Sequence, residues 1–146
     1  MALRAFSLAL VSLAAAGCLG TGTRRIDAPC REMKPMVAWE MMRDNPGIRM
    51  VDIRSDEDVT PEHGRLKNAI EVAQQRLHGG LSRLMPYKTT TLVVLGRDGA
   101  TGHLACETLR KRGFQWVVFV SGGAAEWFAS GLPPESPDPS AKPAAR

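Results

Sequence analysis

The residue types that could do chemistry in this chain are few and widely spaced. The sequence has three cysteines, Cys18, Cys30 and Cys106, and three histidines at positions 63, 78 and 103. A cysteine can accept a lipid, form a disulfide or act as a nucleophilic thiolate. No Cys-x-x-Cys pair and no His/Cys cluster has the spacing of a metal site, so we expect neither a metal nor a cofactor.

The first cysteine follows a segment with the features of an export signal. Arg4 precedes an apolar run over residues 5–16, which is shorter than the roughly 20 residues that span a bilayer and has the proportions of a signal peptide. The stretch from Leu13 to Cys18 (LAAAGC) resembles a bacterial lipobox, whose cysteine is acylated and becomes the new N-terminus. We therefore expect residues 1–17 to be a signal peptide and Cys18 to anchor a lipoprotein that faces the periplasm or the cell exterior.

An ordinary signal-peptidase site is the alternative, because Ala14 and Ala16 form an Ala-x-Ala pattern. Cleavage there would release a soluble secreted or periplasmic protein. Lipoboxes usually have leucine three residues before the cysteine, and Ala15 stands there in this chain. Residues 18–34 begin with small residues and carry four bases against two acids, which predicts a flexible basic tether.

Composition and charge exclude some classes of function. The chain has 146 residues, of which 44% are hydrophobic and 23% charged, as in a single globular domain. Its formal net charge is +4, but residues 36–133 carry 12 bases and 11 acids. A basic surface for nucleic acid is therefore not expected.

Hydrophobic patterning predicts strands that alternate with helices. Strands are expected at residues 48–53, 69–72, 90–95 and 116–120, and helices at 35–43, 103–112 and 124–130. Fully apolar strands alternating with helices are typical of a parallel sheet covered on both faces, whose ligands bind beyond the carboxyl ends of the strands. The strand, glycine-rich turn and helix over residues 91–112 are thus the expected place for chemistry. Residues 134–146 are predicted to be a Pro-rich disordered tail.

Several motifs, in order, resemble one family. They are Val51-Asp52-Ile53-Arg54, Gly64 to Ile70 (GRLKNAI), Leu92 to Leu95 (LVVL), Ser121-Gly122-Gly123, Trp127 and Gly131-Leu132-Pro133. Their order and spacing over residues 35–133 are similar to a single rhodanese-like domain. The resemblance implies an α/β fold with a mostly parallel central sheet of about five strands and helices on both faces.

The resemblance also implies where sulfur-transfer chemistry would lie. In this family a cysteine at the end of a strand accepts a sulfane sulfur, and a C-R-x-G-x-R loop surrounds that sulfur with backbone N–H groups at a helix N-terminus. The matching residues are Gly96, Arg97, Asp98, Gly99, Ala100, Thr101 and Gly102. Gly96 stands at the nucleophile position and Thr101 replaces the second arginine. Cys106, ten residues further on, would lie about 15 Å along the helix, so we expect no sulfurtransferase activity.

The other singled-out residues have expected structural roles. Within the resemblance, Asp52 and Arg54 fix nearby loops. His63 and His78 are expected to be exposed loop residues, His103 a solvated residue of the first helical turn, and Trp127 a core anchor. Cys106 is expected to be a small core residue, with a Cys30–Cys106 disulfide as the alternative. Arg97 either contacts a ligand or pairs with Asp98.

Two hypotheses of function follow. The first is a non-catalytic rhodanese-like module, tethered to a bacterial membrane, that binds an unidentified protein partner. In it the loop keeps its curled shape, and a shallow pocket floored by Gly96 binds an anion weakly. The alternative is a sulfurtransferase or sulfur carrier that uses Cys106, Cys30 or a thiol supplied by a partner.

Overall fold

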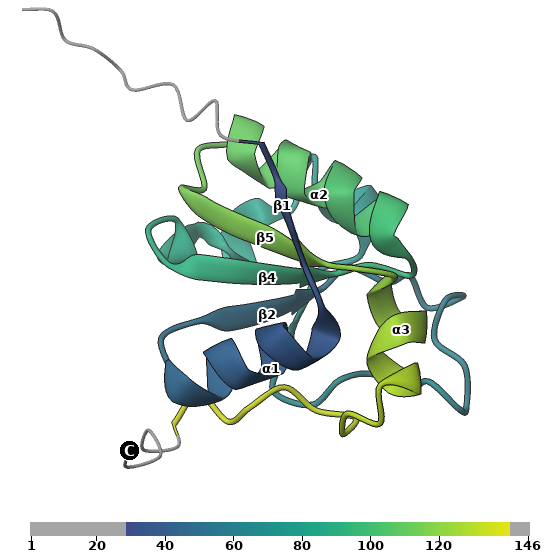
Figure 1. Cartoon of the computed structure of the whole chain (residues 1–146). Helices are drawn as coiled ribbons and strands as arrows, with labels where there is room; N and C mark the ends of the chain where they lie inside the picture. Colours follow the sequence, from purple (N-terminus) through teal and green to yellow (C-terminus); the bar gives the residue numbers. More distant parts are fainter. Residues whose placement is uncertain (1–28, 141–146) are drawn as a thin grey trace, which may run out of the picture.

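A five-stranded parallel sheet lies at the centre of the molecule (Figure 1). A computed structural model describes residues 29–140 of the chain. The strands are β1 (Arg31–Met33), β2 (Arg49–Asp52), β3 (Ile70–Glu71), β4 (Thr91–Leu95) and β5 (Trp116–Val120). They are ordered β1-β5-β4-β2-β3, and every pairing is parallel.

Helices cover both faces of this sheet, as Figure 1 shows. Helix α2 (Gly99–Lys111) packs on one face, and α1 (Pro35–Asp44) and α3 (Gly123–Ala129) pack on the other. Three short 3₁₀ turns, Gln74–Arg76, Leu81–Arg83 and Met85–Tyr87, connect β3 to β4. The expected α/β fold, with a parallel sheet of about five strands between helices, is confirmed.

Strand β4 separates two hydrophobic cores. Successive side chains of a strand point to opposite faces, so Leu92 and Val94 join the core under α2 while Val93 and Leu95 join the core under α1 and α3. Trp127 of α3 is fully buried in the second core, and its indole N–H donates to the Pro133 carbonyl oxygen at 3.2 Å. Trp127 is therefore the core anchor that the sequence indicates.

The structure corrects three expected boundaries. Strand β1 falls inside the proposed tether and pairs with β5, so the folded part begins before residue 35. Helix α2 begins at Gly99 rather than at residue 103. Residues 134–136 belong to the fold, because Lys67 pairs with Glu135 and the buried Ser136 donates its backbone N–H to the Lys67 carbonyl oxygen. The proposed signal peptide, Cys18 and residues 19–28 lie outside the described residues.

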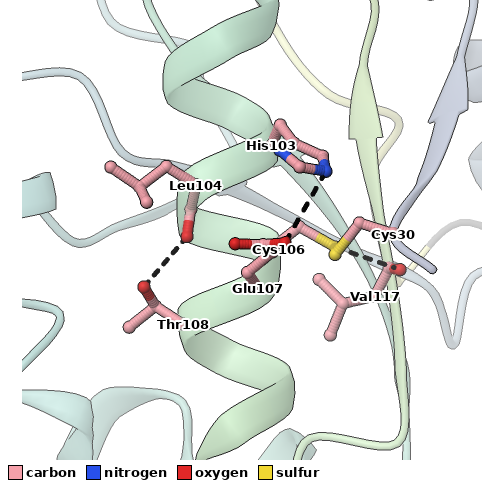
Figure 2. Close-up of a disulfide and its surroundings, with 7 residues drawn as sticks. All are labelled: Cys30, His103, Leu104, Cys106, Glu107, Thr108 and Val117. Atoms are coloured by element: carbon pink, nitrogen blue, oxygen red, sulfur yellow. Dashed lines mark hydrogen bonds and ion pairs between the residues drawn. A yellow bond between two sulfur atoms is a disulfide. The ribbon is translucent and has the colours of Figure 1, made fainter. Parts of the chain in front are cut away.

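A disulfide joins Cys30, just before β1, to Cys106 in α2 (Figure 2). The two cysteines are 76 residues apart in sequence and their Cα atoms lie 6.1 Å apart. Cys106 is buried as expected, but its sulfur is bonded and is not free, so the disulfide alternative is the correct one. The bond holds the edge strand β1 against the helix that covers its neighbour β5.

None of the helices in the part of the chain that the structure describes has the length and apolar character needed to cross a bilayer.

Reduction of the disulfide should destabilise the fold. Closing a loop of this length restricts the unfolded chain, and loss of a native disulfide from a small domain costs about 2–5 kcal/mol. Urea unfolding of the oxidised chain should therefore give a higher midpoint than unfolding in dithiothreitol. A variant with Cys30→Ser and Cys106→Ala should behave like the reduced chain and should not respond to reductant. Equal midpoints for oxidised and reduced wild type would contradict a stabilising bond.

Candidate functional site

The glycine-rich loop lies at the carboxyl end of β4, where ligands of parallel sheets bind. Strand β4 ends at Leu95 and α2 begins at Gly99, so the connection is only three residues long. The turn after β5, Gly122-Gly123, packs against this connection: the Ala124 N–H donates to the Gly96 carbonyl oxygen at 2.9 Å. Two strand ends and two helix starts thus meet at this site.

Asp98 is the N-cap of α2 and forms a capping box with Thr101. Its carboxylate accepts from the Thr101 backbone N–H at 2.8 Å, and its own N–H donates to the Thr101 hydroxyl at 3.1 Å. The Gly102 N–H donates to the Asp98 carbonyl oxygen at 3.1 Å. Three amides of the loop are therefore already used within it. Aspartate is a preferred N-cap residue, and the interpretation of this segment as a turn missed that helix-start signal.

Gly96 does not floor a pocket. A Cβ atom added to Gly96 would fall onto the Thr101 hydroxyl, 2.6 Å from the Gly102 nitrogen and 2.9 Å from the Asp98 carbonyl oxygen. These contacts are far shorter than atoms tolerate, and two of them are to backbone. The expected pocket is wrong, because Thr101 and the first turn of α2 fill the space beside Gly96.

The loop is also closed from the side of α3. Gly123 has a φ of +62°, and a Cβ there would lie 2.6 Å from the Asp98 nitrogen and 2.7 Å from the Gly96 carbonyl oxygen. Only glycine fits this conformation and this close approach. The Gly122-Gly123 pair thus presses the turn after β5 onto the loop after β4.

Arg97 lies between two carboxylates, and most of its side chain is exposed. Its guanidinium lies 3.3 Å from Asp98 Oδ2 and 3.6 Å from Asp58 Oδ1. The pairing with Asp98 that the sequence suggested is present, and Asp58 adds a second partner from another loop. Hydrogen bonds from Ser55, with Arg97 nearby, lower the pKa of Asp58. Arg97 therefore links the loop to residues 55–58.

Asp52 and Arg54 form a fully buried ion pair at the end of β2. Arg54 Nε donates to Asp52 Oδ1 at 3.0 Å and Arg54 Nη2 donates to Oδ2 at 2.7 Å. The guanidinium also donates to the carbonyl oxygens of His63 and Gly64, at 2.8 and 2.9 Å. These bonds fix the loop ahead of β3, in agreement with the structural role expected for both residues.

The histidines do not gather at the loop. His63 is partly buried and stacks on the Phe128 ring at 4.7 Å, so the expectation of an exposed residue is wrong for it. His78 is exposed, and its carbonyl oxygen accepts from Arg112. His103 is exposed on α2, with Nε2 4.0 Å from Glu107 Oε1 and its ring 5.3 Å from that of Phe119.

Among residues 29–140, no three His, Cys, Asp or Glu side chains are grouped to hold a metal ion. A surface cavity of about 370 Å³ lies between α2 and the segment that follows β3. Its lining residues are Gln74, Leu77, His78, Leu104, Ala105, Thr108, Lys111 and Arg112. None of these belongs to the loop at residues 96–102, so that cavity is separate from the candidate site.

Comparison with known proteins identifies the class of fold. The model of the rhodanese-like domain family matches residues 35–130. The chain therefore belongs to the rhodanese-like domain family, which has sulfurtransferase members. No curated protein sequence matches this chain.

Solved structures of similar fold come from archaea and bacteria. A rhodanese-related protein of Thermoplasma volcanium has a TM-score of 0.59 and 20% identity, covering 70% of this chain and 95% of its own. The rhodanese-like domain of an Anabaena protein has a TM-score of 0.55 and 24% identity, covering 81% and 86%. A thiosulfate sulfurtransferase of Pseudomonas aeruginosa has a TM-score of 0.58 and 21% identity, covering 75% of this chain and 20% of its own. At these identities the likeness shows the fold.

The Asp98 cap should give the fold a pH-dependent contribution. Hydrogen bonds from the Thr101 backbone and hydroxyl, with Arg97 nearby, lower the pKa of Asp98. A carboxylate with a lowered folded pKa stabilises the fold above its unfolded pKa of about 3.9, and this contribution disappears as the pH falls through the folded value. Asp98→Ala should cost about 1 kcal/mol at pH 7.

The measurement is urea unfolding of Asp98→Ala and wild type between pH 7 and pH 2. The difference between them should shrink as the pH falls below about 4. Glu57→Ala, which removes an exposed carboxylate from a neighbouring loop, serves as the matched control and should change stability by less than about 0.5 kcal/mol. A loss that is constant over the whole range would mean that the cap is not electrostatic.

Proposed function

We propose that this protein is a non-catalytic rhodanese-like domain, tethered as a lipoprotein to a bacterial membrane, that works by binding another protein. The observation that carries the proposal is the filled space at Gly96. This glycine matches the family's sulfur-accepting position, and a side chain there would collide with Thr101, Gly102 and Asp98. The position therefore has neither a thiol nor room for one.

The state of the other cysteines supports the same proposal. A thiolate is the form that accepts sulfur, and Cys30 and Cys106 are bonded to each other. Sulfur delivered by a partner's thiol would find fewer amides available, because those of Asp98, Thr101 and Gly102 already donate within the loop. The sulfur-carrier alternative also lacks a free thiol among residues 29–140.

The charge of the loop opposes weak anion binding as well. The Asp98 carboxylate sits at the N-terminus of α2, where the helix dipole would otherwise attract an anion from solution. Asp58 adds a second carboxylate close by, and Arg97 is shared between the two. The proposal therefore includes no anion bound in the loop. The partner protein is proposed to bind the outer surface of the domain.

Export is supported by the disulfide. Such bonds form and persist in oxidising compartments such as the bacterial periplasm and the cell exterior, and they are rare in the cytosol. A bond between Cys30 and Cys106 agrees with a signal peptide at residues 1–17. It leaves Cys18 as the remaining cysteine, available for acylation.

Loss of catalysis can be tested directly. The purified protein should form no thiocyanate from thiosulfate and cyanide above a no-enzyme blank. Gly96→Cys should stay inactive, because the new side chain displaces Thr101 and the backbone of the loop, and overpacking of this kind costs about 1–3 kcal/mol. Turnover in wild type that survives replacement of Cys30 and Cys106 would refute the proposal.

Two alanine variants distinguish destabilisation by crowding at Gly96 from the general effect of replacing a glycine. Gly96→Ala should lower the urea midpoint, since its Cβ meets the same three atoms. Gly47→Ala, in a turn where an added Cβ has nothing within 4 Å, should leave the midpoint close to that of wild type. Equal decreases in the urea midpoints of both variants would mean that crowding at Gly96 does not cause the loss of stability.

The anchor is tested independently of the loop. In a bacterial host fed a clickable fatty acid, the protein should become labelled, and Cys18→Ala should abolish the label. Cys30→Ser should keep it, because that cysteine is predicted to be in the disulfide and not acylated. An unlabelled mature form that begins at Gly17 would instead establish ordinary signal-peptidase cleavage.

A further inference from the structure

We infer that the amino end of the sheet is a docking surface for an anionic lipid bilayer. The residues concerned are the exposed Trp116 and four cations from elements that meet at this end of the sheet, Arg31, Lys88, Lys111 and Arg112, here together called the Trp116 surface. The inference adds an orientation to the proposed membrane tether and rests on that proposal. It depends on the exposure of Trp116, on positive charges that have no carboxylate partner among the described residues, and on the place where the chain enters the fold.

The side chain of Trp116 is largely exposed to solvent, which is unusual for a large apolar residue. It is the first residue of β5 and is 61% exposed, whereas Trp127 is fully buried and Trp39 is partly buried against it. A tryptophan has an apolar body and a polar N–H, which suits the boundary between lipid headgroups and acyl chains. Its neighbours Gln115 and Gly113 are exposed too, so the ring lies on an open part of the surface.

The cations reach this place from three separate elements. Lys111 and Arg112 end α2, which leads through Gly113 to Trp116. Lys88 comes from the turn before β4: its carbonyl oxygen accepts from Gln115, and a Cβ added at Gly113 would lie 3.7 Å from its Nζ. Arg31 of β1 is in register with Val118, two residues along β5.

These cations differ from those at the opposite end of the sheet in having no acidic partner. At the carboxyl end Arg54 pairs with Asp52, Arg65 with Asp56, and Arg97 with Asp58 and Asp98. Within residues 29–140, none of Arg31, Lys88, Lys111 and Arg112 forms an ion pair with a carboxylate. Lys and Arg side chains without a carboxylate partner, at the same end of the sheet as an exposed tryptophan, complement anionic headgroups over an apolar interior.

The chain enters the fold at this same end. Cys30 is bonded to Cys106, whose sulfur lies 3.5 Å from the carbonyl oxygen of Val117, the residue after Trp116 (Figure 2). Cys30 comes twelve positions after Cys18, and a chain of that length spans at most about 40 Å. An acylated Cys18 therefore keeps the Trp116 surface near the bilayer, and the disulfide prevents the entry point from moving away.

The test uses residues 18–146 with Cys18→Ser, oxidised, so that no acyl chain contributes. This chain contains every described residue, and therefore both cores and the disulfide. It should sediment with vesicles of phosphatidylglycerol and phosphatidylcholine and not with phosphatidylcholine alone, and raised salt should weaken the binding. Brominated lipids should quench part of the tryptophan fluorescence, and Trp116→Phe should remove that quenching while Trp39 and Trp127 still emit.

Two double charge-reversal variants distinguish vesicle binding through the Trp116 surface from an effect of net charge alone. Lys88→Glu with Lys111→Glu should weaken vesicle binding at least about tenfold. Lys67→Glu with Arg83→Glu makes the same change in net charge beside β3, at the opposite edge of the sheet, and should leave binding within about twofold. Circular dichroism and urea midpoints should confirm that both pairs fold.

Each other outcome overturns the inference. Equal losses in the two pairs would mean that only net charge matters, and binding without quenching of Trp116 would mean that another face touches the lipid. Absence of binding to anionic vesicles would leave the surface for a different partner, such as an acidic protein. Because this chain carries no acyl group, these results are independent of fatty-acid labelling at Cys18, which tests the anchor itself.

Discussion

The buried ion pair of Asp52 and Arg54 holds together the carboxyl end of the molecule. Removing two charges from water costs several kcal/mol per ion, so the pair is stable only because its remaining hydrogen-bonding groups are used. Arg54 donates to the carbonyl oxygens of His63 and Gly64, and its own carbonyl oxygen accepts from Arg65. The segment between β2 and β3 has no helix or strand of its own, and these bonds give it a fixed path. Phe128 of α3 lies beside it, stacked on His63 and 5.8 Å from the Arg54 guanidinium.

The same end of the sheet is closed step by step by internal contacts. Asp58, in the segment fixed by Arg54, reaches Arg97, which in turn pairs with Asp98. Asp98 caps α2 through Thr101, and the Gly122-Gly123 turn presses on the backbone of Gly96 and Asp98. The Asp98 carboxylate thus occupies the N-terminus of α2, and the Thr101 amide at that helix start bonds within the loop.

Hydrophobic patterning in the sequence predicted the strands whose residues are buried in the sheet. Both faces of a parallel sheet are covered, so its central strands consist largely of apolar residues. This made β2, β4 and β5 recognisable in the sequence. Strand β1 escaped prediction because Arg31-Glu32-Met33 is a short edge strand that exists only through its pairing with β5. The disulfide and the packing of Ser136 against Lys67 are likewise long-range, and no spacing in the sequence specifies them. The start of α2 was misplaced for another reason: three glycines hid the helix-start signal of Asp98 and Thr101.

The pairing of charged side chains differs between the two ends of the sheet, although the domain as a whole is nearly neutral. Arg54, Arg65 and Arg97 near the closed end each pair with a carboxylate, and Glu57 and Glu62 are further exposed acids there. Lys88, Lys111 and Arg112 lie at the amino end, so the even total of 12 bases and 11 acids over residues 36–133 does not mean an even distribution along the strands. If the basic end lies on the bilayer, the acidic end points away from it by the length of the sheet. In that orientation, the exposed loop that carries Glu57 and Glu62 would face away from the bilayer, where a partner protein could reach it.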